Sequence, residues 1–150
     1  VRQQYGRESV FLPYGAPLTD PPADRVAELG LTPDAYHLVV ARFEPENHVL
    51  EIVRGYRRSA AKLPLIVVGA PSYSHAYAAA VDEASAADDR VRLVGSVWDQ
   101  QLLDQLYVGA RSVLHGHSVG GTNPSLLRAM GAGMNARVLA KLLRDDRGDA

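Results

Sequence analysis

Short apolar runs alternate with longer amphipathic stretches over most of this chain. Two of the runs are continuous, at residues 38–41 and 65–68, and shorter strands that each contain one polar residue are expected at 91–94 and 112–114. Continuous runs of this length are typical of parallel strands that are covered on both faces of a sheet. A fifth strand is expected at residues 138–139.

The stretches between these runs predict helices. Apolar residues recur at helical spacing in 49–56 and 102–107, alanine dominates 73–87, and one or two turns are expected over 24–29. A last helix is expected to begin with Asn123 as N-cap and Pro124 as first residue, and to end at the glycines that follow. The apolar residues of this helix are expected to face inward: Leu126, Leu127 and Met130.

Strands that alternate with helices predict a parallel sheet with helices on both faces, which is a Rossmann-like, doubly wound α/β fold. In such sheets the ligand lies beyond the carboxyl ends of the strands, where the strand order reverses. The functional loops are therefore expected after Ala41, Val68, Val94 and Leu114.

The composition narrows the class of protein. A length of 150 residues suits one domain, and 16 basic against 17 acidic residues give no reason to expect a nucleic-acid or anionic-membrane partner. There is no cysteine, so disulfides and thiolate metal sites are excluded. No run is long enough to span a bilayer, and no signal peptide is recognisable. Because the sequence starts with Val1, we expect it to be an excerpt.

The strongest local feature is the small-residue segment 115–124, His-Gly-His-Ser-Val-Gly-Gly-Thr-Asn-Pro. Its glycines would let backbone N–H groups approach an anion closely, and the helix expected after Asn123 adds the positive end of its dipole. Together these groups could hold a diphosphate. The same residues also make an ordinary capped turn, and local features do not choose between the two interpretations.

Charged and ionisable side chains lie in the same predicted loops. Arg42 could offset negative charge on a leaving diphosphate, although an exposed pair with Glu44 or Glu46 is favoured when Arg42 is taken alone. His115 and His117 share a face of an extended segment, but two histidines make an incomplete metal site. A histidine that contacts substrate or forms a core hydrogen bond is the favoured interpretation.

Residues 131–136 match the dinucleotide fingerprint Gly-x-Gly-x-x-Ala letter for letter. The fingerprint must follow a strand and open a helix, whereas this segment follows a predicted helix and precedes a predicted strand, so we reject it. No paired carboxylates, Ser-His-Asp order or Walker-type lysine stands out. The sequence therefore indicates a binding site more clearly than a catalytic one.

The order of these motifs resembles the C-terminal domain of retaining GT-B glycosyltransferases, the glycosyltransferase group 1 family, from about residue 5 to residue 140. Within that family, the form of 115–124 is similar to a rhamnosyltransferase-type subgroup. The segments that carry the resemblance are 9–16 (interdomain linker), 38–46 (first strand and arginine loop), 65–69 and 91–97 (next two strands and their loops) and 120–130 (the most diagnostic motif).

The resemblance implies the donor-binding half of a hexosyltransferase, which moves a sugar from a nucleoside diphosphate sugar to an acceptor such as a glycan in polysaccharide biosynthesis, with retention of configuration. It implies no metal and no other cofactor, and the subgroup makes dTDP-rhamnose the expected donor. Arg42 would be the catalytic residue, because it would stabilise the departing diphosphate. The implied nucleotide-sugar contacts are Gly95, Ser96 and Val97 for the base, Gly120, Gly121, Thr122 and Asn123 for the diphosphate, and His117 and Arg128.

The chain departs from the family pattern at three places. Asn47 and His48 stand where a lysine is usual, which weakens the positive clamp. Of two glutamates usual in the motif, Gly120 occupies the first position and Arg128 the second. A carboxylate at 128 would accept hydrogen bonds from ribose hydroxyls, whereas a guanidinium only donates. Arg128→Glu is therefore expected to tighten nucleotide binding, unless Arg128 swings away or meets a phosphate.

The expected organisation is an interdomain linker and lead-in at 1–35, a nucleotide-sugar-binding domain at 36–140 and a polar tail at 141–150. The sixth strand and closing helices of such domains have no room before residue 150, so a C-terminal truncation is expected. The implied partners are the nucleotide sugar and an N-terminal acceptor domain, without nucleic acid or an integral membrane segment. The location would be cytoplasmic, with the intact enzyme free to associate with a membrane. Alone, this chain would bind nucleotide at best.

Other functions stay open. A non-transferring relative, such as a nucleotide-sugar 2-epimerase, would also bind nucleotide sugars between two domains. A degenerate, non-catalytic interaction module would account for Arg128 and the missing lysine. A dehydrogenase comes last, because its fingerprint is misplaced.

Overall fold

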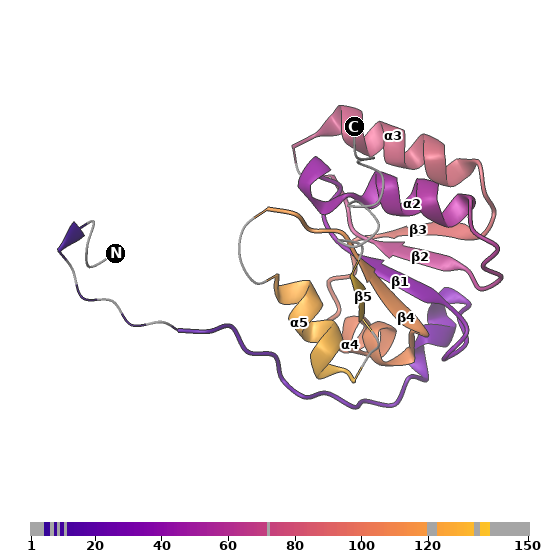
Figure 1. Ribbon diagram of the computed structural model, residues 1–150. Helices are drawn as coiled ribbons and strands as arrows, with labels where there is room; N and C mark the ends of the chain where they lie inside the picture. Colours follow the sequence, from indigo (N-terminus) through magenta and orange to yellow (C-terminus); the bar gives the residue numbers. More distant parts are fainter. Residues whose placement is uncertain are drawn as a thin grey trace.

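The computed structural model describes residues 5, 6, 8, 10, 12–71, 73–119, 123–133 and 136–138. Within them, parallel strands form one sheet in the order β3-β2-β1-β4-β5. Helices α2 and α3 cover one face of this sheet, and α4 and α5 cover the other (Figure 1). The predicted Rossmann-like, doubly wound α/β fold is confirmed. The strands are β1 (His37–Val40), β2 (Leu65–Val68), β3 (Val91–Gly95), β4 (Ser112–His115) and β5 (Ala136–Val138).

The helices begin and end close to the predicted positions. Two short 3-10 helices are present in the described residues: η1 (Arg25–Leu29) precedes β1, and η2 (Pro45–Asn47) precedes α2. The α-helices are α2 (Val49–Arg57), α3 (His75–Ala86), α4 (Gln100–Gly109) and α5 (Pro124–Gly131). Asp99 caps α4 by accepting hydrogen bonds from the N–H groups of Gln101 and Leu102.

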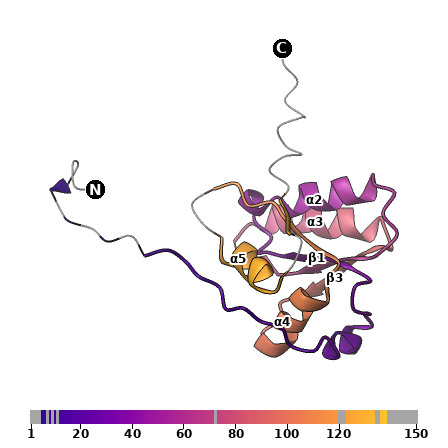
Figure 2. The same cartoon turned by 60° about the horizontal axis from the view of Figure 1, so that its bottom comes forward.

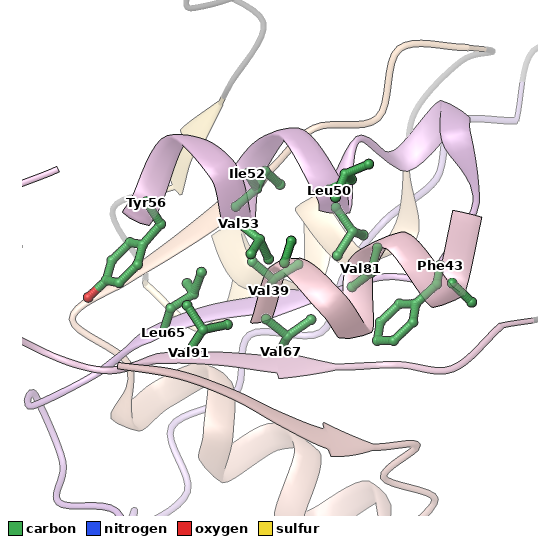
Figure 3. Close-up of a cluster of buried hydrophobic side chains, with 13 residues drawn as sticks. Val39, Phe43, Leu50, Ile52, Val53, Tyr56, Leu65, Val67, Val81 and Val91 are labelled. Carbon is green, nitrogen blue, oxygen red and sulfur yellow. The ribbon is translucent and has the colours of Figure 1, made fainter. Parts of the chain in front are cut away.

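One apolar core lies between the sheet and the helices α2 and α3. Figure 3 shows the apolar face of α2, with Ile52, Val53 and Tyr56, lying over side chains of the strands such as Val39 and Val67. These α2 residues follow helical spacing, which is why one face of the helix is apolar. Each fully buried aliphatic side chain contributes about 1.5–3 kcal/mol relative to an exposed one.

A second apolar core lies on the opposite face, under α4, η1 and α5. Leu38 points into this core whereas its neighbour Val39 belongs to the first one, as expected for alternating sides of a strand. Val26 and Leu31, from the segment assigned to the lead-in, are buried here. Earlier in the chain, the described residues 12–15 lie away from the layered domain in both views (Figures 1 and 2).

The inward face of α5 differs from the prediction at one residue. Met130 was expected to face inward, but its side chain is 59% exposed, whereas Ala129 is fully buried. Successive residues of a helix point about 100° apart, so the burial of Ala129 turns Met130 toward the edge of the contact. The small Ala129 takes that position, and Leu126 and Leu127 are half-buried at its flanks.

The last described strand follows α5 directly, so the segment that begins at Gly131 lies between a helix and a strand. This context is the one for which we rejected the dinucleotide fingerprint. None of the helices in the described part of the chain has both the length and the apolar character needed to cross a membrane.

Candidate functional site

A hollow of about 230 Å³ opens at the carboxyl ends of β1 and β4. These strands are sheet neighbours although β2 and β3 lie between them in the sequence, so the strand order reverses here. This is the position at which open α/β sheets bind ligands. The walls of the hollow come from the end of β1 with Arg42, the end of β4 with His117, and the start of α5.

The loop after β1 is held by the end of β2. The N–H of Ala41 donates to the carbonyl oxygen of Val68 at 3.0 Å, and the N–H of Phe43 donates to that of Ala70 at 3.1 Å. Arg42, between them, lines the hollow with an exposed side chain. Among the ion pairs of the described residues, none involves Arg42. Its guanidinium is therefore available to an anion in the hollow.

The glutamates that follow Arg42 are held by the loop after β2. Glu44 is fully buried and accepts a hydrogen bond at Oε1 from the N–H of Tyr73 at 2.9 Å. Glu46 accepts one from the hydroxyl of Tyr73 at 2.8 Å. Hydrogen bonds from its own backbone N–H and from Tyr73 lower the pKa of Glu46. Both glutamates thus help to fix the arginine loop.

Hydrogen bonds join the loop after β1 to the loop after β4. Nδ1 of His117 lies 2.9 Å from Oδ1 of Asn47. His48 Nδ1 lies 2.8 Å from the carbonyl oxygen of Gly116, and the N–H of Ser118 donates to the carbonyl oxygen of Glu46 at 3.0 Å. Asn47 and His48, which stand where the sequence resemblance implied a lysine, therefore connect the two loops by hydrogen bonds.

Gly116 makes this close approach possible. A Cβ at this position would lie 2.7 Å from the carbonyl oxygen of Asn47 and 3.0 Å from Cβ of His48, which is too close for an ordinary contact. Gly116 was expected only as part of the small-residue segment 115–124, and Asn47 and His48 only as replacements for a lysine, because a single sequence does not reveal contacts between such distant residues.

The start of α5 forms another wall of the hollow. Asn123 caps the helix by accepting a hydrogen bond at Oδ1 from the N–H of Ser125 at 2.9 Å, and both residues line the hollow. The helix therefore directs the positive end of its dipole toward this region. Gly120, Gly121 and Thr122, which the sequence analysis assigned to the diphosphate, lie outside the described residues.

The loop after β3 lies at the same edge of the sheet but does not line the hollow. Gly95 ends β3, and Ser96 and Val97 follow it. Because β3 is two strands from β1 in the sheet, this loop is displaced from the hollow by roughly 10 Å. Trp98, which the sequence analysis did not single out, is 91% exposed beside them.

Arg128 is held by α4. Its Nη2 lies 2.7 Å from Oδ1 of Asp104, and its Nε donates to the same oxygen at 2.8 Å. Both side chains are mostly buried in the contact between α4 and α5, and Arg128 is not among the residues that line the hollow. Its assignment as a nucleotide contact stays a prediction.

Charge reversal at Arg128 is expected to destabilise the fold. Arg128→Glu would place a carboxylate against Asp104 and lower the free energy of unfolding by about 1–2 kcal/mol, because like charges would meet in a half-buried contact. Urea denaturation measures this change. The control is the charge swap Arg128→Glu with Asp104→Arg, which should recover most of the loss. Nucleotide binding by the double variant then tests, without the folding defect, whether a carboxylate at position 128 tightens binding. An unchanged stability of the single variant would contradict the stabilising role of the contact between Arg128 and Asp104.

His115 is a buried histidine at the floor of the site. Burial lowers its pKa first, and repulsion from the neighbouring His117 ring, whose centroid is 6.2 Å away, lowers it further. His117 uses Nδ1 to bind Asn47. In the part of the chain that the structure describes, no cluster of three or more His, Cys, Asp or Glu side chains could hold a metal ion.

Because the pKa of His115 is lowered, we expect the free energy of unfolding to decrease as the pH is lowered below about 6.5. Unfolded histidine takes up a proton near pH 6.5, whereas folded His115 resists protonation until lower pH, so the unfolded state binds more protons in that window. Urea denaturation between pH 7.5 and 5.5 measures the slope. His115→Gln should reduce the slope, and His75→Gln, at an exposed position of α3, should not. Equal slopes in wild type and His115→Gln would contradict the prediction.

No protein-family model and no curated protein matches this sequence. Solved structures do match it. The GtfA/B complex matches over 83% of this chain and 23% of its own, with 23% identity and a TM-score of 0.56. The lipopolysaccharide outer core galactosyltransferase WaaB, in its apo form, matches over 83% and 34%, with 22% identity and a TM-score of 0.59.

A third match is an α,α-trehalose-phosphate synthase (UDP-forming) from Burkholderia xenovorans in complex with glucose-6-phosphate. It matches over 73% of this chain and 29% of its own, with 17% identity and a TM-score of 0.60. The chain therefore spans between 23% and 34% of the length of these three structures. Likeness at such identities establishes the fold: the chain has the Rossmann-like α/β fold of a domain of GT-B glycosyltransferases.

Proposed function

We propose that this chain is the donor-binding domain of a glycosyltransferase and holds a nucleoside diphosphate sugar in the hollow at the ends of β1 and β4. One observation carries the proposal. The hollow lies where the strand order reverses, and both Arg42 and the N-terminus of α5 line it. These are two independent sources of positive potential for a diphosphate.

The charges around the hollow favour an anion. The guanidinium of Arg42 is exposed and forms no ion pair among the described residues. The first turn of α5 adds N–H groups that have no partner within the helix, together with the positive end of its dipole. A charge-assisted hydrogen bond is about twice as strong as a neutral one, so a phosphate would gain more from this site than a neutral ligand would.

The size of the hollow suggests which parts of the ligand it would hold. A volume of about 230 Å³ is below the range of roughly 300–1,000 Å³ for complete ligand pockets, so it suits the sugar and the diphosphate. The base would then extend along the same edge of the sheet toward Gly95, Ser96 and Val97. Their displacement from the hollow, about two strand spacings, fits a nucleoside attached to a diphosphate.

The finer assignments rest on the sequence resemblance. Under this proposal the intact enzyme is a retaining hexosyltransferase of the group 1 family, acts in the cytoplasm without a metal or other cofactor, and builds a polysaccharide. Its donor is dTDP-rhamnose, and an N-terminal acceptor domain of the same enzyme supplies the facing wall of the site. The 150-residue chain alone binds the donor but does not transfer its sugar.

Isothermal titration calorimetry with UDP, GDP and dTDP tests the proposal. We expect one nucleoside diphosphate to bind, with its monophosphate weaker and its nucleoside weaker still, because the site recognises the diphosphate. NADH serves as the control for a dinucleotide site and should not bind. Absence of binding by all three diphosphates, or equal binding of diphosphate and nucleoside, would contradict the proposal.

A further inference from the structure

Asn47 lies between the two loops that form the hollow. Its side chain is 7% exposed and makes hydrogen bonds in two directions. Nδ2 donates to the carbonyl oxygen of Arg42 at 2.9 Å, and Oδ1 lies 2.9 Å from Nδ1 of His117. One buried amide therefore contacts both the arginine loop and the histidine of the opposite loop.

These contacts determine the orientation of the amide. If oxygen and nitrogen of Asn47 were exchanged, two carbonyl oxygens would face each other at Arg42, and no hydrogen bond would form there. In the orientation that satisfies Arg42, the amide oxygen faces His117. Because that oxygen can only accept, Nδ1 of His117 must carry the hydrogen.

The hydrogen on Nδ1 decides what His117 offers to a ligand. In the neutral ring, Nε2 then carries a lone pair and acts as an acceptor. His117 lines the hollow, and its Nε2 forms no hydrogen bond with any other described residue. An acceptor atom repels phosphate oxygens, whereas a hydroxyl group can donate to it. The neighbouring Arg42 and α5 N-terminus suit the diphosphate instead.

We infer that Asn47 is a positioning residue that holds His117 in its Nδ1–H form, so that Nε2 accepts a hydrogen bond from a hydroxyl group of the donor sugar. This inference rests on the proposed function and names a specificity determinant for its sugar. Asn47 also holds the backbone carbonyl of Arg42. A single side chain thereby sets the relative positions of the groups that contact the sugar and the diphosphate.

The first part of the test is spectroscopic and needs no ligand. Long-range ¹⁵N–¹H NMR spectra of the histidine rings distinguish the Nδ1–H form from the Nε2–H form. We expect Nδ1–H for His117 in the wild type and in Asn47→Asp, whose carboxylate still accepts from Nδ1. Asn47→Ala should give a mixture of the two forms. His75, an exposed histidine of α3, should be the same in all three proteins.

The second part compares a nucleoside diphosphate with its nucleotide sugar, for example dTDP with dTDP-rhamnose. His117→Ala should weaken binding of the nucleotide sugar about five- to tenfold and change binding of the diphosphate by less than twofold. Asn47→Ala should cause a similar loss for the nucleotide sugar. Adding His117→Ala to Asn47→Ala should cause little further loss, because the two residues act as one unit.

Several results would overturn the inference. An Nε2–H form of His117 in the wild type, or an equal effect of His117→Ala on both ligands, contradicts it. If the wild type binds neither ligand, the proposed function fails and the sugar contact fails with it, while the ring spectra still show whether Asn47 sets the form of His117. If Asn47→Ala does not fold, the wild type, Asn47→Asp and His117→Ala decide the question.

Discussion

Gly69→Ala is expected to lower the free energy of unfolding by about 3 kcal/mol or more. A Cβ at this position would overlap with the carbonyl oxygen of Ala41 and lie 2.9 Å from its carbonyl carbon and 3.2 Å from Cε1 of Phe43. The φ angle of +153° adds backbone strain for any residue with a side chain. Relief of the overlap would separate the ends of β1 and β2, on which the arginine loop rests.

Chemical denaturation followed by circular dichroism measures this loss. Gly55→Ala is the matched control, because the same change in the exposed part of α2 meets no atom within 4 Å. It should raise stability by roughly 0.5–1 kcal/mol, since alanine favours the helix over glycine. Equal stability of Gly69→Ala and wild type would show that the strand ends do not approach each other as described.

Arg42→Ala is expected to weaken binding of the preferred nucleoside diphosphate by ten- to a hundredfold or so, which corresponds to the loss of a charged hydrogen bond worth about 1.5–3 kcal/mol. The guanidinium lines the hollow and forms no ion pair among the described residues, so its loss should leave the fold intact. Calorimetric titration of both proteins measures the difference.

Arg54→Ala is the matched control for Arg42. Arg54 is exposed on α2 and does not line the hollow, and its replacement removes the same charge. It should change the affinity by less than twofold at physiological ionic strength, where charges more than about 8 Å apart are largely screened. Equal effects of the two substitutions would mean that Arg42 acts only through the overall charge of the protein.

Most of the fold could be predicted because its signals are local. Continuous apolar runs marked β1 and β2, short apolar-rich segments marked β3 and β4, and capping residues such as Asp99 and Asn123 marked where helices begin. Met130 was misplaced because helical spacing gives an apolar face but not the direction in which that face turns. The neighbouring elements decide the direction, and here they favour Ala129.

The position of the candidate site was predicted from topology, but its internal contacts were not. The strand order places the hollow at the ends of β1 and β4, and Arg42 follows from the same reasoning. Asn47 was interpreted only as a missing lysine, because its partner His117 lies 70 residues later. Arg128 was considered as a ribose or phosphate contact, or as a side chain that swings away, because nothing in the sequence pairs it with Asp104.

The central claim is that a nucleoside diphosphate binds at the carboxyl edge of the sheet, between the arginine loop and the start of α5. Backbone amide NMR during titration with the best-binding nucleoside diphosphate tests it most directly. The account predicts chemical-shift changes concentrated in residues 41–48, 95–98 and 115–125. Changes concentrated at the opposite edge, around residues 34–36, 63–64 and 110–111, or no saturable changes at all, would contradict it.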